Sequence, residues 1–492
     1  MNNFYLIGDS TVAKFNDVTY YYSRFGYGTK LDNYFKDLNI INLALSGRSS
    51  KSFLKEDNYN YFLNHVSKGD YLLLGFGHND EKFDDPARFT NANLDLDDPN
   101  SFKYHLYNYY IKVAQEKGCK VILATPIVRL NKNNIYEGVE IHDTPNGNYN
   151  KAIIELADKL NLLCIDLTKM TLDYVKERGY NNSALTHAIT NGKKENDKIV
   201  PDLLTTDNTH LNEFGADLVA YFVAISIKNS LSSLKNYLKD DIKMPLLSSL
   251  KINPTFIYKE YKVPDLKNYK PPYQFDTKTD NIYGTAFGNT NGVPNDPKIG
   301  YFACKDDDKY LVGQNSNILN GKIQTSGDAF AFLFKQISSN KNFYIEGNIK
   351  IKSFKLTKDA AFGLMLRDDC YINQEEENYT IATNYIACGM LTADRSTYIN
   401  FSRENPANIK KYNTMDGFYE ENDNIFVSLK RVGQAVDIHL SYKNKNYDQN
   451  FVDFDLINKD NNYMYLGFFA TKGTLILIDN IKFEILGDAI EA

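Results

Sequence analysis

The sequence contains no tryptophan and no excess of basic residues. Its 492 residues include 56 lysines and arginines against 62 aspartates and glutamates, a formal net charge of −6. Nucleic acids and anionic membranes both attract basic surfaces, so a slightly acidic chain is a poor partner for either. No uninterrupted apolar stretch approaches the roughly 20 residues of a membrane-spanning helix. We therefore expect neither nucleic acid nor a membrane as a partner.

Cysteine is also scarce, and the five cysteines are widely scattered. Their odd number does not indicate a disulfide framework, and no CxxC or Cys/His pair has the spacing of a metal site. Residues 1–8 have no basic n-region, no apolar h-region of signal-peptide length and no small-residue cleavage site. We expect reduced thiols in a cytoplasmic protein, or a secreted one if a leader has been removed.

Residues 1–235 alternate short apolar runs with helical patterns. The runs are near-continuously apolar, as expected for strands covered on both faces, and they span residues 4–7, 40–44, 71–76, 121–125 and 162–165. Helical patterns span residues 104–117, 149–160 and 213–227. This alternation predicts a parallel sheet with helices on both faces and with functional groups at the carboxyl ends of the strands.

The pattern changes after residue 235. Residues 236–275 contain five prolines and no sustained periodicity, which is typical of a linker or a wrapping segment. In residues 276–492 the apolar period becomes two: Phe343, Ile345, Ile349 and Ile351 alternate with polar residues. Several such strands, separated by Asn, Asp, Gly and Lys turns, predict an antiparallel β-sandwich.

Four polar motifs occur in the first region, three of them directly after predicted strands. They are Gly8-Asp9-Ser10-Thr11, Ser46-Gly47-Arg48-Ser49-Ser50, Gly75-Phe76-Gly77-His78-Asn79-Asp80 and Thr206-Asp207-Asn208-Thr209-His210. Each motif alone is weak, because Gly-Asp-Ser is also a common turn and helix-capping sequence. As a set they supply a serine nucleophile, hydrogen-bond donors for an oxyanion, and a histidine base oriented by an aspartate three residues earlier.

This ordered set resembles the conserved blocks of the SGNH (GDSL-type) hydrolases. The resemblance implies a flavodoxin-like three-layer α/β sandwich. It makes Ser10 the nucleophile, His210 the base and Asp207 the residue that orients the base. It also implies an oxyanion hole formed by the backbone N–H groups of Ser10 and Gly47 and the side chain of Asn79.

Longer stretches around these blocks resemble the rhamnogalacturonan acetylesterase branch of that family, over roughly the first 230 residues. They include Gly8-Asp-Ser-Thr-Val, Ser46-Gly-Arg-Ser-Ser-Lys-Ser-Phe, Gly77-His-Asn-Asp-Glu-Lys and Thr125-Pro-Ile-Val-Arg129. Leu130 departs from the branch, which often has a second arginine there. Candidate substrate contacts are Asp9, Arg48, His78 and Arg129. For His78 a structural role is the alternative, and for the two arginines a solvated or salt-bridged position is the default.

The second region resembles the concanavalin-like jelly-roll modules that accompany polysaccharide-degrading enzymes. The resemblance rests on Gly327-Asp328-Ala329-Phe330, residues 361–368 and residues 479–483. Such modules stack sugars on tryptophan or tyrosine, and this chain has 37 tyrosines, most of which must be ordinary core or surface residues. Glycan binding, a structural role and pairing into a homo-oligomer all remain open for this region.

The function implied by the resemblance is removal of acetyl groups from pectic oligosaccharides or polysaccharides through an acetyl-enzyme on Ser10. This chemistry needs neither a metal nor an organic cofactor. One alternative is a lipid or aryl short-chain esterase, which would need an apolar acyl pocket. The other is a glycan-binding protein whose esterase domain is incidental, against which the intact motif set argues.

Overall fold

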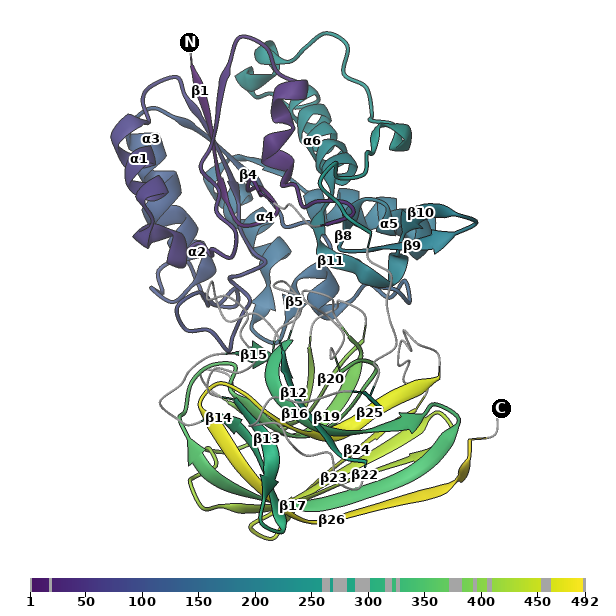
Figure 1. The fold of residues 1–492 in the computed structure, drawn as a ribbon. Coiled ribbons are helices and arrows are strands. Elements are labelled where there is room, and N and C mark those ends of the chain that lie inside the picture. Colours follow the sequence, from purple (N-terminus) through teal and green to yellow (C-terminus); the bar gives the residue numbers. More distant parts are fainter. Residues whose placement is uncertain are drawn as a thin grey trace. The chain divides into compact units, whose positions relative to one another are not determined.

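A computed structural model describes residues 2–16, 20–258, 266–268, 281–287, 301–314, 321–323, 328–370, 383–392, 396–404, 409–452 and 462–489. The chain divides into two compact units, Met1–Tyr258 and Lys259–Ala492. The first is an α/β unit and the second is all-β, as the sequence predicts (Figure 1). Among the described residues, no helix has the length and apolar character that crossing a membrane requires.

The first unit is built on a five-stranded parallel sheet in the order β2-β1-β3-β4-β7. Its strands are β1 (Asn3–Gly8), β2 (Asn39–Asn42), β3 (Tyr71–Gly75), β4 (Lys120–Ala124) and β7 (Leu163–Ile165). Numbered within the sheet, this is the flavodoxin-like order 2-1-3-4-5, in which the chain reverses direction across the sheet between β1 and β3. The predicted strands and their parallel arrangement are confirmed.

Helices cover both faces of this sheet (Figure 1). Phe4 and Leu6 pack on one face with α6, while Tyr5 and Ile7 pack on the other face with α1, α2 and α4. This alternation explains why residues 4–7 of β1 are all apolar. The helices are α1 (Asp57–His65), α2 (Phe102–Leu106), α3 (Lys112–Glu116), α4 (Tyr149–Leu160), α5 (Leu167–Ala184) and α6 (Glu213–Lys228).

The predicted helix over residues 104–117 is present, but it contains a π-helical turn, η4 (Tyr107–Ile111), between α2 and α3. Short 3₁₀ helices occupy several connections: η1 (Tyr27–Thr29), η2 (Leu31–Asn33), η3 (Ser52–Lys55), η5 (Gly138–Ile141), η6 (Leu203–Thr205), η7 (Ser233–Tyr237) and η8 (Leu247–Ser249). Three small antiparallel pairs join β5 (Asp143–Thr144) to β6 (Gly147–Asn148), β8 (His187–Ile189) to β11 (Thr206–Leu211), and β9 (Gly192–Glu195) to β10 (Lys198–Pro201). The sequence pattern does not predict these pairs.

The chain beyond residue 235 returns to the first unit. The backbone N–H of Lys239 donates to the Tyr34 carbonyl (2.9 Å), and that of Asn253 donates to the Tyr21 carbonyl (2.9 Å). The Tyr21 and Phe256 rings also meet edge-on, with centroids 5.0 Å apart. Residues 236–258 therefore wrap the first unit, which ends at Tyr258. Of the remaining predicted linker, only residues 266–268 are described.

The second unit consists of two antiparallel sheets. One contains β12 (Tyr283–Phe287), β16 (Asp328–Ser338), β25 (Tyr463–Ala470), β18 (Ala361–Arg367), β19 (Tyr385–Thr392), β20 (Thr397–Arg403) and β21 (Lys410–Met415), with β15 (Lys322–Ile323) beside β16. The other contains β13 (Tyr301–Asp306), β14 (Lys309–Gln314), β26 (Thr474–Asp488), β17 (Lys341–Phe354), β22 (Asn424–Val432), β23 (Ala435–Tyr442) and β24 (Lys445–Phe451).

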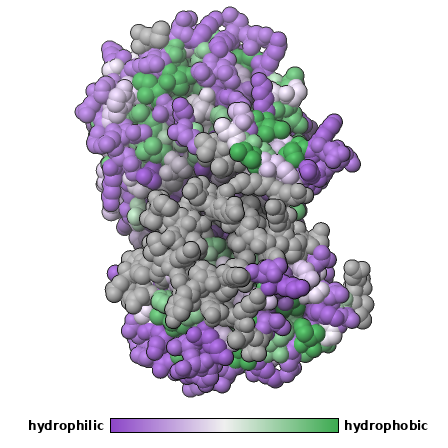
Figure 2. All heavy atoms as spheres, in the orientation of Figure 1, coloured by the Kyte–Doolittle hydropathy of each residue, from purple (hydrophilic) through white to green (hydrophobic). Residues whose placement is uncertain are grey.

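An apolar core fills the space between these sheets. Ile345, Ile349 and Ile351 of β17 are buried in it, which is the reason for the period of two in this strand. The antiparallel sandwich is therefore confirmed. Gly327, one of the residues quoted for the resemblance, lies outside the described residues. Figure 2 shows polar residues over much of the visible described surface, with apolar residues between them.

Candidate active site

Ser10 lies in a tight turn directly after β1. The Asp9 carboxylate shapes this turn, because its Oδ1 accepts hydrogen bonds from the backbone N–H (2.9 Å) and the hydroxyl (2.8 Å) of Thr11. The turn also lies close to β3: a Cβ on Gly8 would sit 2.4 Å from the Gly75 carbonyl oxygen. Glycine is therefore required at position 8 by close backbone approach, and the serine that follows is held at the carboxyl edge of the sheet.

The Gly47 loop follows β2 and lies beside the Ser10 turn. The backbone N–H of Leu45 donates to the Gly8 carbonyl (3.2 Å). Gly47 lies two residues after Leu45 and Ser10 lies two residues after Gly8, so both closely follow this hydrogen bond. Gly47 has a φ of 76°, a conformation that favours glycine, and a Cβ there would meet nothing within 4 Å. Its backbone therefore borders open space.

Asn79 belongs to the loop after β3, and both ends of its amide are engaged. Its Nδ2 donates to the Arg48 carbonyl (3.0 Å), and its Oδ1 accepts from Nη1 of Arg88 (3.2 Å). An amide nitrogen carries two hydrogens, so one N–H of Asn79 remains for another acceptor. The bond to Arg48 also joins the β3 loop directly to the Gly47 loop.

Asp80 makes a second and stronger connection between these two loops. It is fully buried and accepts hydrogen bonds from the backbone N–H (3.1 Å) and hydroxyl (2.5 Å) of Ser50 and from the hydroxyl of Thr90 (2.8 Å). Burial raises the pKa of this carboxyl to about 7, although these hydrogen bonds oppose the shift. Asp80 therefore fixes the spacing between the loops that carry Gly47 and Asn79.

Asp207 and His210 form a hydrogen-bonded pair on β11. Nδ1 of His210 lies 2.7 Å from Oδ2 of Asp207, and the other carboxylate oxygen accepts from the backbone N–H groups of Thr209 (2.8 Å) and His210 (3.0 Å). Burial alone would raise the pKa of Asp207, but the charge of His210 and these hydrogen bonds hold it below its usual value. Asp207 is therefore an anion that occupies one imidazole nitrogen and leaves Nε2 for another partner.

A bulge in β11 presents this pair. Thr206 pairs with Ile189 and Leu211 pairs with His187, so residues 207–210 lie opposite the single residue Ala188. The residues between these two pairs have no regular partner in β8, so Asp207 and His210 lie outside the strand pairing.

Residues 25–27 tie this bulged strand to the Ser10 turn. The backbone N–H of Phe25 donates to the Leu211 carbonyl (2.8 Å), and that of Tyr27 donates to the Thr11 carbonyl (2.8 Å). The rings of Phe15 and His210 also meet edge-on, with centroids 5.6 Å apart. The structure therefore brings together at one edge of the sheet all four segments that the sequence analysis selects.

Comparison with known proteins supplies the family. Residues 6–218 match the model of the GDSL-like lipase/acylhydrolase family. The chain is 32% identical over 228 residues to the probable rhamnogalacturonan acetylesterase YesY of Bacillus subtilis, a match covering 46% of this chain and 93% of the relative. The chain belongs to the GDSL-like lipase/acylhydrolase family. It is thus an ester hydrolase, as the sequence predicts.

Two further relatives of this GDSL-like chain are also named rhamnogalacturonan acetylesterases. The rhamnogalacturonan acetylesterase RhgT of Bacillus subtilis is 30% identical over 235 residues, covering 48% of this chain and 93% of the relative. The rhamnogalacturonan acetylesterase of Emericella nidulans is 28% identical, covering 44% of this chain and 80% of the relative. In the all-β unit, residues 315–487 match the model of the pectate disaccharide-lyase N-terminal domain.

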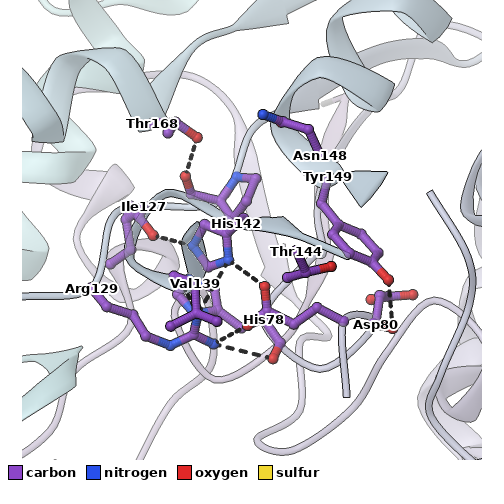
Figure 3. A network of polar contacts seen from close by, with 12 residues as sticks. His78, Asp80, Ile127, Arg129, Val139, His142, Thr144, Asn148, Tyr149 and Thr168 are labelled. Atoms are coloured by element: carbon purple, nitrogen blue, oxygen red, sulfur yellow. Dashed lines mark hydrogen bonds and ion pairs between the residues drawn. The ribbon is translucent and has the colours of Figure 1, made fainter. Parts of the chain in front are cut away.

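A buried ionic network lies next to the Asn79 loop of the GDSL-like unit (Figure 3). The Glu81 carboxylate contacts Nη2 of Arg129 (2.5 Å) and Nδ1 of His142 (2.9 Å), while Nε2 of His142 lies 2.7 Å from the Ile127 carbonyl. Burial alone would raise the pKa of Glu81, but the charges of Arg129 and His142 hold it below its usual value. The His78 ring packs edge-on against His142, with centroids 4.4 Å apart.

The structure places the four candidate substrate contacts differently. Arg129 is buried within the ionic network, which favours a structural role over sugar binding. Arg48 is half-exposed and paired with Glu56. Asp9 and His78 are both buried, and burial raises the pKa of Asp9 and lowers that of His78.

Sequence reasoning missed the positions that support the site. Glu81 follows the third motif directly and Asp80 lies inside it, so these two could have been found from the motif. Nothing in the sequence pattern distinguishes His142 or Arg88, because their partners lie in other segments. Among the described residues, no group of three or more His, Cys, Asp or Glu side chains could hold a metal ion.

Proposed function

We propose that this chain removes acetyl groups from pectic, rhamnogalacturonan-type oligosaccharides through an acetyl-enzyme on Ser10. The observation that carries the proposal is the Asp207–His210 pair at 2.7 Å, tied through residues 25–27 to the turn that holds Ser10. The names of the relatives support the substrate class, and so does the match of the second unit to a domain named for pectate disaccharide-lyases.

The first half of the reaction forms the acetyl-enzyme. Oγ of Ser10 attacks the acetyl carbonyl carbon while Nε2 of His210 takes the hydroxyl proton, and Asp207 stabilises the imidazolium that forms. The negative charge on the carbonyl oxygen is met by the N–H groups of Ser10 and Gly47 and by the second N–H of Asn79. The bond to the sugar oxygen then breaks, and that oxygen leaves with the proton from His210.

The second half restores the enzyme. A water molecule attacks the acetyl carbon as His210 takes one of its protons, and the same donors again stabilise the oxyanion. When the ester bond to Ser10 breaks, His210 returns the proton to Oγ and acetate leaves. Protein groups carry every proton in this sequence.

The lipid esterase alternative would need room for a long acyl chain. The loops around Ser10 are instead rich in Ser, Asn, Asp and Arg, which favours a sugar over a lipid tail.

The test is acetate release from acetylated rhamnogalacturonan oligosaccharides by wild type and Ser10→Ala. We expect wild-type turnover and a loss of roughly 10⁴-fold or more in the variant, with an unchanged melting temperature. Residual activity of the variant within about tenfold of wild type would contradict the nucleophile assignment. A series of p-nitrophenyl esters from acetate to octanoate separates the lipid alternative, which predicts faster hydrolysis of the longer chains.

A further inference from the structure

The loop after β3 folds back on itself and returns Arg88 to Asn79. The backbone N–H of Lys82 donates to the Asn79 carbonyl (3.4 Å), and that of Asp85 donates to the Lys82 carbonyl (2.9 Å). The backbone N–H of Arg88 then donates to the Asp85 carbonyl (3.0 Å). Each bond closes a four-residue turn, and the succession brings Nη1 of Arg88 to 3.2 Å from Oδ1 of Asn79.

The last of these turns, Asp85-Pro86-Ala87-Arg88, is fixed by its own sequence. Aspartate at the first position and proline at the second are favoured in common β-turns. Oδ1 of Asp85 accepts a hydrogen bond from the backbone N–H of Ala87 (3.1 Å), and its Oδ2 pairs with Nε of Arg88. Both side chains are mostly buried, so water screens this pair little. The turn therefore holds the guanidinium in place beside Asn79.

Arg88 and the Arg48 carbonyl select the same orientation of the Asn79 amide. A guanidinium can only donate hydrogen bonds, so the Asn79 atom that faces Arg88 must be the carbonyl oxygen. A backbone carbonyl can only accept, so the atom that faces Arg48 must be the amide nitrogen (3.0 Å). The reversed amide would place donor against donor and acceptor against acceptor. Asn79 is also buried, so water does not compensate for such a reversal.

We infer that Arg88 is a positioning residue, which holds the Asn79 amide in the orientation that keeps its second N–H available to the oxyanion. The inference rests on the proposed function, because it takes Asn79 to be an oxyanion donor. A reversed amide would turn its carbonyl oxygen toward the negative charge that develops in the reaction. Arg88 therefore acts on the transition state through Asn79, and its effect belongs to kcat and not to KM.

The test is a double-mutant cycle of Arg88→Met and Asn79→Ala on p-nitrophenyl acetate, a small ester whose hydrolysis does not depend on recognition of a sugar. We expect Arg88→Met to lower kcat about tenfold at constant KM, the low end for loss of a hydrogen bond to a charged group, because the Arg48 carbonyl still favours the correct amide. In the Asn79→Ala background the same change should have no further effect, since no amide remains to be oriented.

Two further variants separate amide orientation from general loosening of the loop. Arg88→Lys keeps a group that only donates, so it should recover part of the lost kcat. Lys51→Met is the matched control: Nζ of Lys51 donates to the Pro86 carbonyl in the same turn (2.9 Å), but Lys51 makes no contact with Asn79 among the described residues. We expect wild-type kcat for Lys51→Met. The melting temperature of each variant shows whether it is folded.

Three results would overturn the role of Arg88. They are multiplicative losses in the double variant, a rise in KM at constant kcat, and an equal loss of kcat in Lys51→Met. The first and third would make the effect one of loop order, and the second would make Arg88 a substrate contact. If Arg88→Met does not fold, Arg88→Lys takes its place in the cycle, and an equal loss of kcat with and without Asn79 would overturn the inference.

The same measurements distinguish failure of this inference from failure of the proposed function. An impaired Asn79→Ala together with a fully active Arg88→Met would overturn the role of Arg88 alone. Wild-type kcat in Asn79→Ala would overturn the oxyanion assignment in the proposed function, and the role of Arg88 with it.

Discussion

Each of the two units contains a histidine paired with an aspartate, and the two pairs have nearly the same length. Nδ1 of His210 lies 2.7 Å from Asp207 in the α/β unit, and Nδ1 of His439 lies 2.6 Å from Asp448 in the β-sandwich. The second pair arises from regular pairing of β23 with β24, in which His439 lies directly opposite Asp448. The first arises from an irregular stretch of β11.

The surroundings of the two aspartates differ more than the pairs themselves. The Asp207 side chain is 21% exposed and receives two backbone N–H groups, whereas the Asp448 side chain is 72% exposed. An exposed pair is screened by water and does not hold the imidazole ring firmly. A short histidine–aspartate contact is therefore not enough for a base. The Asp207–His210 pair differs in three respects: it lies on a bulge, its aspartate receives backbone N–H donors, and its strand is tied to the serine turn.

The largest expected difference in activity is between the alanine variants of the two histidines. His210→Ala should lose roughly 10⁴-fold or more in kcat, because the general base is removed. His439→Ala should stay within about twofold of wild type on a small acetyl ester. Acetate release by the purified full-length variants measures both. Equal losses would mean that the two pairs are not as different as their environments indicate.

The next largest effect concerns the buried arginines of the two units. Arg129 pairs with Glu81 beside the Asn79 loop, whereas Arg403 makes a two-bond contact with Asp328 (2.9 and 2.6 Å) within the second unit. Breaking a buried ion pair by removing one partner costs about 3–5 kcal/mol. We expect Arg129→Met and Arg403→Met each to destabilise its own unit by that amount.

Activity separates these two variants. Arg129 orders a loop with irregular backbone that carries Asn79, so Arg129→Met should also lower kcat. Arg403 joins strands that the sheet already orders, so Arg403→Met should hydrolyse a small ester at nearly the wild-type rate. Calorimetric unfolding with acetate release on the same samples gives both values. A large loss of kcat in Arg403→Met would show that the second unit takes part in the chemistry.

Two asparagines provide a smaller contrast. Asn79→Ala should cost about 10²–10³ in kcat with little change in KM, as for removal of one oxyanion donor. Asn400→Ala removes an amide that donates to the Tyr447 carbonyl (3.4 Å) within the second unit, and kcat should not change. Steady-state kinetics on one acetyl ester tests the pair. A rise in KM with constant kcat for Asn79→Ala would make it a ground-state binding residue.

The smallest expected effect is a pH dependence of stability from Asp80. Its folded pKa of about 7 lies above the value of 3.8 for an unperturbed aspartate, so the folded state binds more protons between these limits. The contribution is full below pH 3.8 and is lost as the pH rises through 7. Wild type should lose about 2 kcal/mol of unfolding free energy relative to Asp80→Asn between pH 5 and 7. If the unfolding free energies of the two proteins changed with pH in the same way, the raised pKa of Asp80 would be contradicted.

Asp207 contributes with the opposite sign, since its pKa is lowered on folding. Its stabilising contribution is present above pH 3.8 and is lost as the pH falls below that value. Unfolding curves of Asp207→Asn at pH 2 to 5 should therefore converge with those of wild type toward the acid end. Curves that diverge toward low pH would contradict this assignment.

The sequence by itself determined the strands and helices whose side chains alternate between buried and exposed positions. Helix α4 spans the predicted residues 149–160, and the period of two in β17 matches its buried isoleucines. It also determined the order of the four motifs and the parallel sheet that gathers them. These features depend on neighbouring residues along one element, and periodicity reports such local burial directly.

Only the tertiary structure decided which charges are buried, which loops are joined and where the first unit ends. Arg48 and Arg129 are equivalent in the sequence, but one is half-exposed and the other is enclosed with Glu81 and His142. The return of residues 236–258 to the first unit follows the same rule, because their partners Tyr21 and Tyr34 belong to a distant segment. The physical reason is that an ion pair or a pocket wall depends on partners from distant segments, and no local pattern records which segments meet.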